Sequence, residues 1–508
     1  MNCHAEIPVT LMAQFNEFIA DNIGLHFPQD RWQDLMRGID SAARDSGTSD
    51  TQSFIEQLMS RSLSKREIEM LASHLTVGET YFFRDEITFA ALEEHILHKL
   101  IRQRQNGERC LRIWSAGCCT GEEPYSIMIL LSRLLPDLDD WRVTLLATDI
   151  NPRFLERASS GIYGGWSFRA TPLHIREQYF TKTAEGRFRI DPRIRKRATF
   201  TYLNLAEDVY PSLLNNTNAM DIIFCRNVLM YFSPKTAEKV ICKFHRCLVE
   251  GGLLIVSPIE SPQGLTCEFA REHYPGVVFY RKNSNQSHIT ETSIPRFQAE
   301  GTGTSFLSPL DGITDESMAW LPETDSKTRP IDEVTDGVTA TLPPGPLEQA
   351  RVLYDQGCYE EATEKLHIAV QDPGNIEAKM LLARTLANQG RLSEALAWCV
   401  KAVAADKLNP ASRYLLAVIL QEQGQVTDAI AALKLALYLD PEFVLACFAL
   451  GILFRQQGRP REAEKYFQHA LTKLGGYPPE HHLAEGEGMT VGRLGEIIRL
   501  ALDKETAI

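Results

Sequence analysis

The sequence has no apolar run long enough to cross a membrane, and its N-terminus has no basic segment followed by an apolar one. It also lacks an excess of positive charge, because the formal net charge is −13, which argues against a general nucleic-acid binder. The eleven cysteines do not show the paired spacing of a zinc site. We therefore expect a cytoplasmic protein with no membrane insertion, no nucleic-acid partner and no metal.

The chain of 508 residues is too long for a single hydrophobic core, so we expect several domains. Residues 1–90 are expected to form a helical domain, because 11–25 and 64–75 carry apolar residues at helical spacing. Ser62 or Ser64 is the candidate N-cap of the second helix, with Glu67 in its first turns.

Residues 91–283 alternate between short β-rich runs and helical runs, which is typical of an open α/β sheet. The expected strands lie at 111–116, 142–149, 198–205, 220–227 and 251–258, and the expected helices at 124–135, 151–160 and 233–248. A turn at 184–186 interrupts this alternation. It predicts a small antiparallel β insertion near 176–200.

Residues 284–345 are rich in Ser, Thr, Pro and Gly and hold ten acidic residues against three basic ones. This composition predicts a disordered acidic linker. Residues 346–475 then repeat four times, with turn glycines Gly357, Gly390, Gly424 and Gly458 at intervals of 33, 34 and 34. The period matches tetratricopeptide (TPR) repeats, and residues 476–508 are expected to form a tail with a capping helix.

The stretch "RIWSAGCCTGEEPYS" at 112–126 reads as a buried strand, a turn of small residues and the start of a helix. A phosphate-binding P-loop would need Lys-Ser/Thr after the last glycine, but Gly121 is followed by Glu122 and Glu123. A dinucleotide site would need a different glycine spacing. The methionine moiety of S-adenosylmethionine (SAM) fits better, since its positive groups favour nearby acids.

Asp149 ends the next predicted strand, "LLATD", where an acid can accept hydrogen bonds from both hydroxyls of a ribose. The alternative interpretation is that Glu122 and Asp149 only cap helices. The residues of this stretch leave both interpretations open.

Five motifs occur in order along residues 10–282: "TVGETYFFRD", "WSAGCCTGEEPYSI", "ATDINPRFLERASSGIY", "LNL" and "CRNVLMYF". Together they resemble the chemotaxis-receptor glutamate methyltransferases, the CheR family. The resemblance implies an N-terminal helical domain packed on a Rossmann-like, SAM-binding α/β domain with a small β-subdomain. It also implies methyl transfer from SAM to glutamate side chains of a chemoreceptor, with S-adenosylhomocysteine as the product.

The resemblance also implies site residues. Arg84 and Tyr231 correspond to a catalytic pair that faces the substrate carboxylate. The implied cofactor-binding residues are Thr80, Arg84, Glu123, Asp149, Asn204, Leu205, Asn227 and Val228. Gly78 stands where the family often has asparagine.

The TPR repeats predict a groove for an unidentified protein or peptide, in addition to the receptor's cytoplasmic domain. The fold class expected is thus multidomain: helical domain, α/β methyltransferase with β-subdomain, disordered linker and all-α TPR solenoid. Two other functions compete with receptor methylation. One is a non-catalytic TPR scaffold regulated by SAM or S-adenosylhomocysteine, and the other is methyl transfer to a small-molecule acid.

Overall fold

The computed structural model describes residues 7–48, 50–105, 109–213, 215–260, 269–283, 345–486 and 489–503. Apart from Gly345, the predicted acidic linker at 284–345 lies outside these residues. Within the described stretches, no helix combines the length and the apolar character that crossing a membrane requires.

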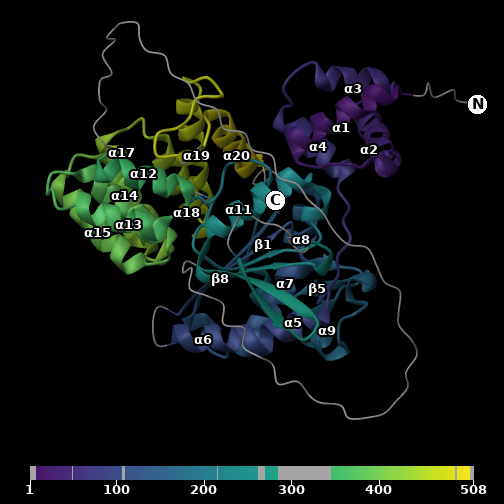
Figure 1. The fold of residues 1–508 in the computed structure, drawn as a ribbon, viewed down its shortest axis with the longest axis horizontal. Helices are drawn as coiled ribbons and strands as arrows, with labels where there is room; N and C mark the ends of the chain where they lie inside the picture. The colour runs from purple at the N-terminus through teal and green to yellow at the C-terminus, as the bar shows by residue number, and fades with distance from the viewer. Residues whose placement is uncertain are drawn as a thin grey trace, which may run out of the picture. The chain divides into compact units, whose positions relative to one another are not determined.

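The N-terminal region is helical, as the sequence predicts (Figure 1). Its helices are α1 (Val9–Ile23), α2 (Trp32–Asp45), α3 (Thr51–Met59) and α4 (Lys65–Leu75). Ser64 is the N-cap of α4 and forms a capping box with Glu67, which decides between the two candidate serines. The buried faces meet in one apolar cluster that includes Phe15, Leu35 and Leu71.

A seven-stranded sheet forms the centre of the α/β region, in the strand order β6-β2-β1-β7-β8-β10-β9. Its parallel strands are β1 (Cys110–Ala116), β2 (Arg142–Asp149), β6 (Ala198–Tyr202), β7 (Met220–Cys225) and β8 (Leu248–Val256). The order reverses between β1 and β7. At such a switch point, the loops after the two neighbouring strands leave in opposite directions and open a crevice.

Both faces of the sheet are covered, so the inner strands are mainly apolar on both faces rather than alternating. In β1, Leu111 and Ile113 pack into one core, whereas Trp114 and Ala116 pack into the other. Helix α7 (Glu122–Leu134) covers the first face and α11 (Pro234–Cys247) covers the second.

The remaining helices of this region connect the strands. They are α5 (Glu86–Ala91), a π-helical stretch η2 (Leu92–Leu97), α6 (His98–Gln105), α8 (Pro152–Ser160), α9 (Leu173–Tyr179) and α10 (Pro192–Arg195). Helix α8 begins at an Asn151 cap followed by Pro152, which is a favourable pair at a helix start.

A second sheet has three antiparallel strands in the order β3-β5-β4. They are β3 (Ile162–Tyr163), β4 (Phe180–Lys182) and β5 (Phe188–Ile190). The predicted turn at 184–186 joins β4 to β5, and Gly186 has a positive φ of 75° there.

The sequence analysis did not identify the hairpin that completes the large sheet. Strands β9 (Phe269–Tyr274) and β10 (Val277–Lys282) pair antiparallel, and β10 also pairs antiparallel with β8. Polar residues interrupt β9, which lies at the sheet edge, so its apolar pattern is weak. Edge strands often carry such residues.

The C-terminal region consists of paired helices with the predicted repeat. The pairs are α12 (Pro346–Gln356) with α13 (Tyr359–Ala369), α14 (Ile376–Asn388) with α15 (Leu392–Ala405), α16 (Pro410–Glu422) with α17 (Val426–Leu439), and α18 (Val444–Gln456) with α19 (Pro460–Leu474). The four turn glycines all have positive φ values, between 70° and 79°. Glycine adopts this conformation without the steric cost of a side chain.

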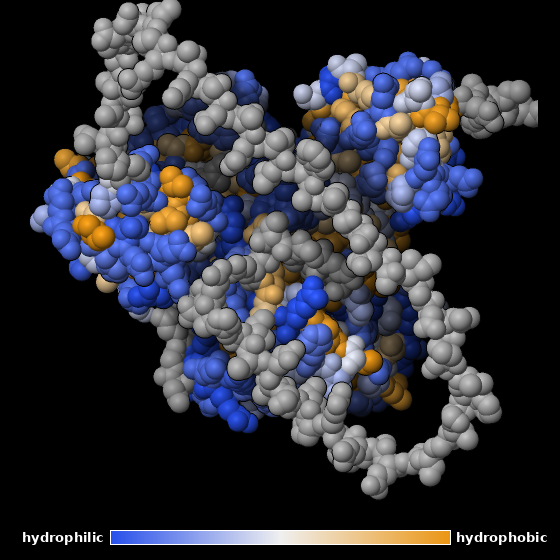
Figure 2. All heavy atoms as spheres, viewed as in Figure 1, coloured by the Kyte–Doolittle hydropathy of each residue, from blue (hydrophilic) through white to orange (hydrophobic). Residues whose placement is uncertain are grey.

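The surface of these repeats drawn in Figure 2 is mainly hydrophilic, with separate hydrophobic spots. Val352, Val400 and Leu408 are among the exposed apolar residues of the repeats. The last helix, α20 (Val491–Asp503), packs beside α19 and buries Leu494 and Ile498 in the apolar cluster of the repeats. It therefore covers an end of the array, as expected for a capping helix.

Gly121 tests how tightly the turn after β1 is built. Its φ is 92°, and a Cβ there would lie 2.8 Å from the Cβ of Ala158. Gly121→Ala should lower the free energy of unfolding by about 2–5 kcal/mol. This loss combines the cost of alanine in the left-handed conformation with the cost of the steric contact with Ala158. Equilibrium urea unfolding followed by circular dichroism measures the loss.

The matched control is Gly186→Ala. Gly186 also has a positive φ, but a Cβ there would meet no atom within 4 Å. Only the backbone cost, about 1 kcal/mol, should remain. Equal losses for the two substitutions would show that Ala158 does not constrain the turn.

Candidate functional site

A pocket lies at the carboxyl ends of β1, β2, β6 and β7, at the switch point of the sheet. The space between its lining atoms, open mouth included, is about 1020 Å³. The segment between α4 and α5 and the end of α1 complete its wall. All nine of the site residues expected from the sequence line it: Thr80, Arg84, Glu123, Asp149, Asn204, Leu205, Asn227, Val228 and Tyr231.

The turn after β1 forms one wall of the pocket. Gly117 has a φ of 78°, and a Cβ there would lie 2.3 Å from Cγ2 of Val228. This contact leaves no room for any side chain at Gly117, so the backbone itself forms the wall. The backbone N–H of Cys119 then donates a hydrogen bond of 2.8 Å to Asp149.

Asp149, at the end of β2, is a buried carboxylate that receives only backbone donors among the described residues. One oxygen accepts from the N–H of Asn151 at 2.8 Å and the other from the N–H of Cys119 at 2.8 Å. Burial raises the pKa of Asp149 to about 6, although these hydrogen bonds oppose the shift. Each oxygen keeps capacity to accept a further hydrogen bond from a ligand.

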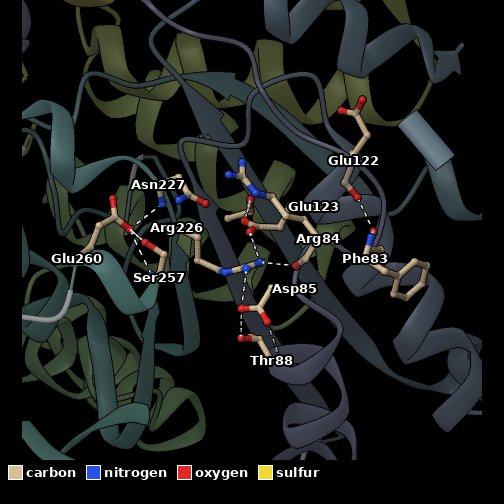
Figure 3. Close-up of polar contacts among 12 residues, drawn as sticks. Phe83, Arg84, Asp85, Thr88, Glu122, Glu123, Arg226, Asn227, Ser257 and Glu260 are labelled. Atoms are coloured by element: carbon tan, nitrogen blue, oxygen red, sulfur yellow. Dashed lines mark hydrogen bonds and ion pairs between the residues drawn. The ribbon is translucent and has the colours of Figure 1, made fainter. Parts of the chain in front are cut away.

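Glu123, in the first turn of α7, is the second buried carboxylate of the pocket. It accepts a hydrogen bond of 2.8 Å from the Ser115 hydroxyl and pairs with Arg226 at 3.5 Å (Figure 3). Burial raises its pKa, while the charges of Arg226 and Arg84 act in the opposite direction.

Glu122 differs from its neighbour, because it does not line the pocket. Its carboxylate accepts hydrogen bonds from the hydroxyls of Thr120 at 2.6 Å and Ser167 at 3.0 Å. The two adjacent carboxylates therefore separate into one that stabilises the turn and one that faces the ligand space.

Arg226 directly follows β7, lines the pocket, and was missed by the sequence analysis. Its guanidinium donates to the backbone oxygen of Arg84 at 2.9 Å and to the Asp85 carboxylate at 3.1 Å (Figure 3). Its Nε is buried and has no hydrogen-bond partner among the described residues. A basic residue directly after an apolar strand was the available signal for this position.

Arg84 and Tyr231 approach the pocket from different segments. The Arg84 guanidinium donates a hydrogen bond of 2.6 Å to the backbone oxygen of Glu79 and does not pair with Asp85 or Glu86 in the part of the chain described. The Tyr231 hydroxyl, in contrast to Arg84, has no hydrogen-bond partner among the residues that the structure describes. Both groups can therefore accommodate a ligand.

The remaining predicted residues shape the walls. The Asn204 side chain accepts from the N–H of Ala206 at 3.0 Å and donates to the Asn22 backbone oxygen at 3.3 Å. At Gly78, a Cβ would lie 2.7 Å from the ring of Phe154, which itself lines the pocket. An aromatic ring thus takes the space that an asparagine side chain would need.

Four non-glycine residues with positive φ lie at or next to this pocket. Cys119 at 50° and Asn227 at 58° line it, and Phe83 at 56° and Asp85 at 68° flank the lining residue Arg84. L-amino acids rarely adopt this conformation. Strained backbone of this kind concentrates at ligand sites, where surrounding contacts enforce it.

The chemistry of the pocket fits SAM. Asp149 offers a buried acceptor of the kind that binds ribose hydroxyls, and Glu123 offers negative charge for the positive groups of the methionine end. Arg84, which also lines the pocket, offers guanidinium donors for a carboxylate. The pocket therefore has a polar group for each of three parts of SAM: its ribose, its positively charged groups and its carboxylate.

Comparison with known proteins agrees with this geometry. A family model described as "CheR methyltransferase, SAM binding domain" matches residues 78–273. Two tetratricopeptide-repeat models match the C-terminal region, one at 353–419 and the other at 400–443 and 414–481.

Curated relatives carry related names. "Chemotaxis protein methyltransferase 2" of Vibrio cholerae is 35% identical over 43% of this chain and 74% of its own length. A "Probable chemotaxis protein methyltransferase" of Rhizobium etli is 35% identical over 44% of this chain and 81% of its own length. "Probable biofilm formation methyltransferase WspC" of Pseudomonas aeruginosa is 36% identical over 39% of this chain and 45% of its own length.

The cofactor is thus SAM, and the repeats are of the kind that bind other proteins. With its switch-point pocket, its two buried carboxylates and these matches, the chain belongs to the CheR family of chemotaxis methyltransferases and is a SAM-dependent methyltransferase with C-terminal TPR repeats.

Proposed function

We propose that this enzyme methylates glutamate side chains in the cytoplasmic domains of methyl-accepting chemoreceptors and forms glutamate 5-O-methyl esters in a chemosensory pathway. The observation that carries the proposal is the position of Arg84 and Tyr231. Both line the pocket that also contains Glu123 and Asp149. The names of the relatives, which are chemotaxis methyltransferases, support the choice of acceptor.

A glutamate acceptor makes modest chemical demands on the protein. Its free pKa is about 4.3, so the carboxylate is an anion at neutral pH and needs no general base. When bound, SAM supplies a methyl group carried on a positively charged sulfur. The protein must hold one carboxylate oxygen in line with that methyl group and exclude water.

We assign these tasks to the two residues at the pocket. The planar guanidinium of Arg84 orients the acceptor carboxylate without removing its charge. The hydroxyl of Tyr231 donates a hydrogen bond to the second carboxylate oxygen, which leaves the first free to react. Thr80, Glu123, Asp149, Asn204, Leu205, Asn227 and Val228, together with Arg226, hold the cofactor.

The repeats serve recruitment in this proposal. Stacked helical repeats present an extended concave surface that suits a peptide or helix of a partner protein. We propose that this surface binds a second protein of the same pathway, in the cytoplasm, where the receptor's acceptor helices lie.

The test of the proposed function is a methyl-transfer assay with labelled SAM and the purified cytoplasmic domains of receptors from the same organism. We expect base-labile label on the receptor, mapped by mass spectrometry to glutamate. Label on a small acid but not on any receptor would contradict the proposal, and SAM binding without transfer to any acceptor would favour a regulatory scaffold.

Asp149→Ala should weaken SAM binding by about 2–4 kcal/mol, because a charged acceptor for two hydroxyls is lost. Isothermal titration calorimetry measures the dissociation constant. Asp139→Ala is the control, since Asp139 has a 97% exposed side chain and does not line the pocket. An unchanged affinity in Asp149→Ala would remove this residue from the cofactor site.

The affinity for SAM should also depend on pH. With a pKa raised to about 6, Asp149 is charged at neutral pH and becomes protonated as the pH falls through about 6. Affinity should therefore be full above about pH 7 and fall below it, with Glu123 contributing in the same direction because its pKa is also raised. Titrations of wild type and Asp149→Asn compare the profiles, and a flat wild-type profile down to about pH 5 would contradict the assignment.

Arg84→Ala should lower kcat by about 100-fold, while the dissociation constant for SAM changes by less than about tenfold, because the acceptor loses its orientation. Arg84→Lys keeps the charge but not the planar fork, so it should recover only part of the rate. Single-turnover kinetics at saturating receptor separate these quantities. Turnover near the wild-type rate in Arg84→Ala would exclude the orienting role.

Tyr231→Phe should lower kcat by about tenfold without unfolding the protein, because only one hydroxyl is removed. The ring, which lies 5.8 Å from the Arg31 guanidinium, stays in place. The readouts are kcat and the thermal unfolding midpoint. Normal kinetics would assign Tyr231 to packing alone.

A further inference from the structure

Glu260 lies outside the pocket and outside the predicted site, on the short turn η6 (Pro258–Glu260) after β8. It is only 9% exposed, which is unusual for a glutamate. Its carboxylate accepts hydrogen bonds from two backbone N–H groups, one oxygen from Asn227 at 2.6 Å and the other from Met230 at 3.2 Å. Figure 3 shows Glu260 beside Asn227 and Ser257.

Both N–H groups belong to the turn that carries Asn227 and Tyr231. Asn227 has a φ of 58°, and the short helix η5 (Leu229–Tyr231) follows it directly. Asparagine tolerates this φ better than most residues, but a single conformation of the turn still requires a constraint from its surroundings. One carboxylate that binds both ends of the turn supplies such a constraint.

Glu260 is itself held in place from its own turn. Ser257 donates to the same oxygen that accepts from Asn227, through its hydroxyl at 2.5 Å and its backbone N–H at 3.2 Å. The carboxylate therefore has a fixed orientation before it meets the turn of Asn227. Charge-assisted hydrogen bonds of this kind are stronger than neutral ones.

We propose that Glu260 is a positioning residue for methyl transfer, because it fixes the turn that places Asn227 at the cofactor and Tyr231 at the acceptor. This proposal rests on the proposed roles of Asn227 and Tyr231. Glu260 is not among the residues that line the pocket, so the proposed effect passes through these two residues.

Glu260→Gln tests this role while preserving size. Glutamine has a single acceptor oxygen, which stays with the three donors of Asn227 and Ser257. Its NH₂ group then meets the N–H of Met230, so the turn loses one of its two contacts with this side chain. We expect kcat to fall about tenfold or more and the dissociation constant for SAM to rise about tenfold. Asp221→Asn is the matched control, because Asp221 is a buried carboxylate in β7 that accepts from the N–H of Arg112 at 2.9 Å but does not line the pocket. It should lower the thermal midpoint without these kinetic effects.

A double-mutant cycle with Tyr231→Phe separates positioning from general destabilisation. If Glu260 acts on turnover through Tyr231, Glu260→Gln should lower kcat by less than about threefold in the Tyr231→Phe background. The same factor in both backgrounds, or an unchanged kcat, would overturn the proposal. Ser257→Ala provides a milder variant, with a smaller loss of kcat that Tyr231→Phe also suppresses, should Glu260→Gln fail to fold.

The two readouts keep this proposal distinct from the proposed function. If the wild-type enzyme transferred no methyl group to receptors, the proposed function would fail. Calorimetric titration of SAM would still test whether Glu260 places Asn227 at the cofactor. An unchanged dissociation constant in folded Glu260→Gln would overturn that role.

Discussion

The geometry of the pocket depends on one buried guanidinium. Arg226 binds the backbone oxygen of Arg84, the carboxylate of Asp85 and the carboxylate of Glu123. Removing a charge from water is costly unless its partners are well placed. The segment before α5, the first turn of α7 and the end of β7 must therefore take one mutual arrangement. That arrangement brings Arg84 and Glu123, 39 positions apart in the sequence, to the same ligand space.

The features that the sequence predicts well are those governed by neighbours along the chain. The capping box of Ser64 and Glu67 and the positive φ of the turn glycines Gly357 and Gly390 follow from local rules. The strands β1 and β7 are evident because strands buried on both faces are mainly apolar, as these two are apart from Arg112, Ser115 and Asp221. Asp149 was identifiable for the same reason, since it ends such a strand.

The features that the sequence analysis missed depend on contacts across the fold. Strand β9 is half exposed, so no clean alternation marks it. Arg226 and Glu260 acquire their importance only when β7 and β8 lie side by side and their loops meet. In the sequence, Glu260 is an acid that follows Ile259, and nothing local distinguishes it from a surface residue. Glu122 and Glu123 give a second example, because spacing alone cannot tell which of these two adjacent carboxylates faces the ligand.

The left-handed residues around the pocket bear on how this enzyme can change over time. For Phe83 and Cys119 this conformation costs about 1–3 kcal/mol each, whereas Asp85 and Asn227 are of residue types that adopt it more readily. Glycine would remove the backbone cost at these positions, but it would also remove the buried ring of Phe83 and the Asp85 carboxylate that pairs with Arg226. The stability of the rest of the fold therefore compensates for the strained backbone at this pocket.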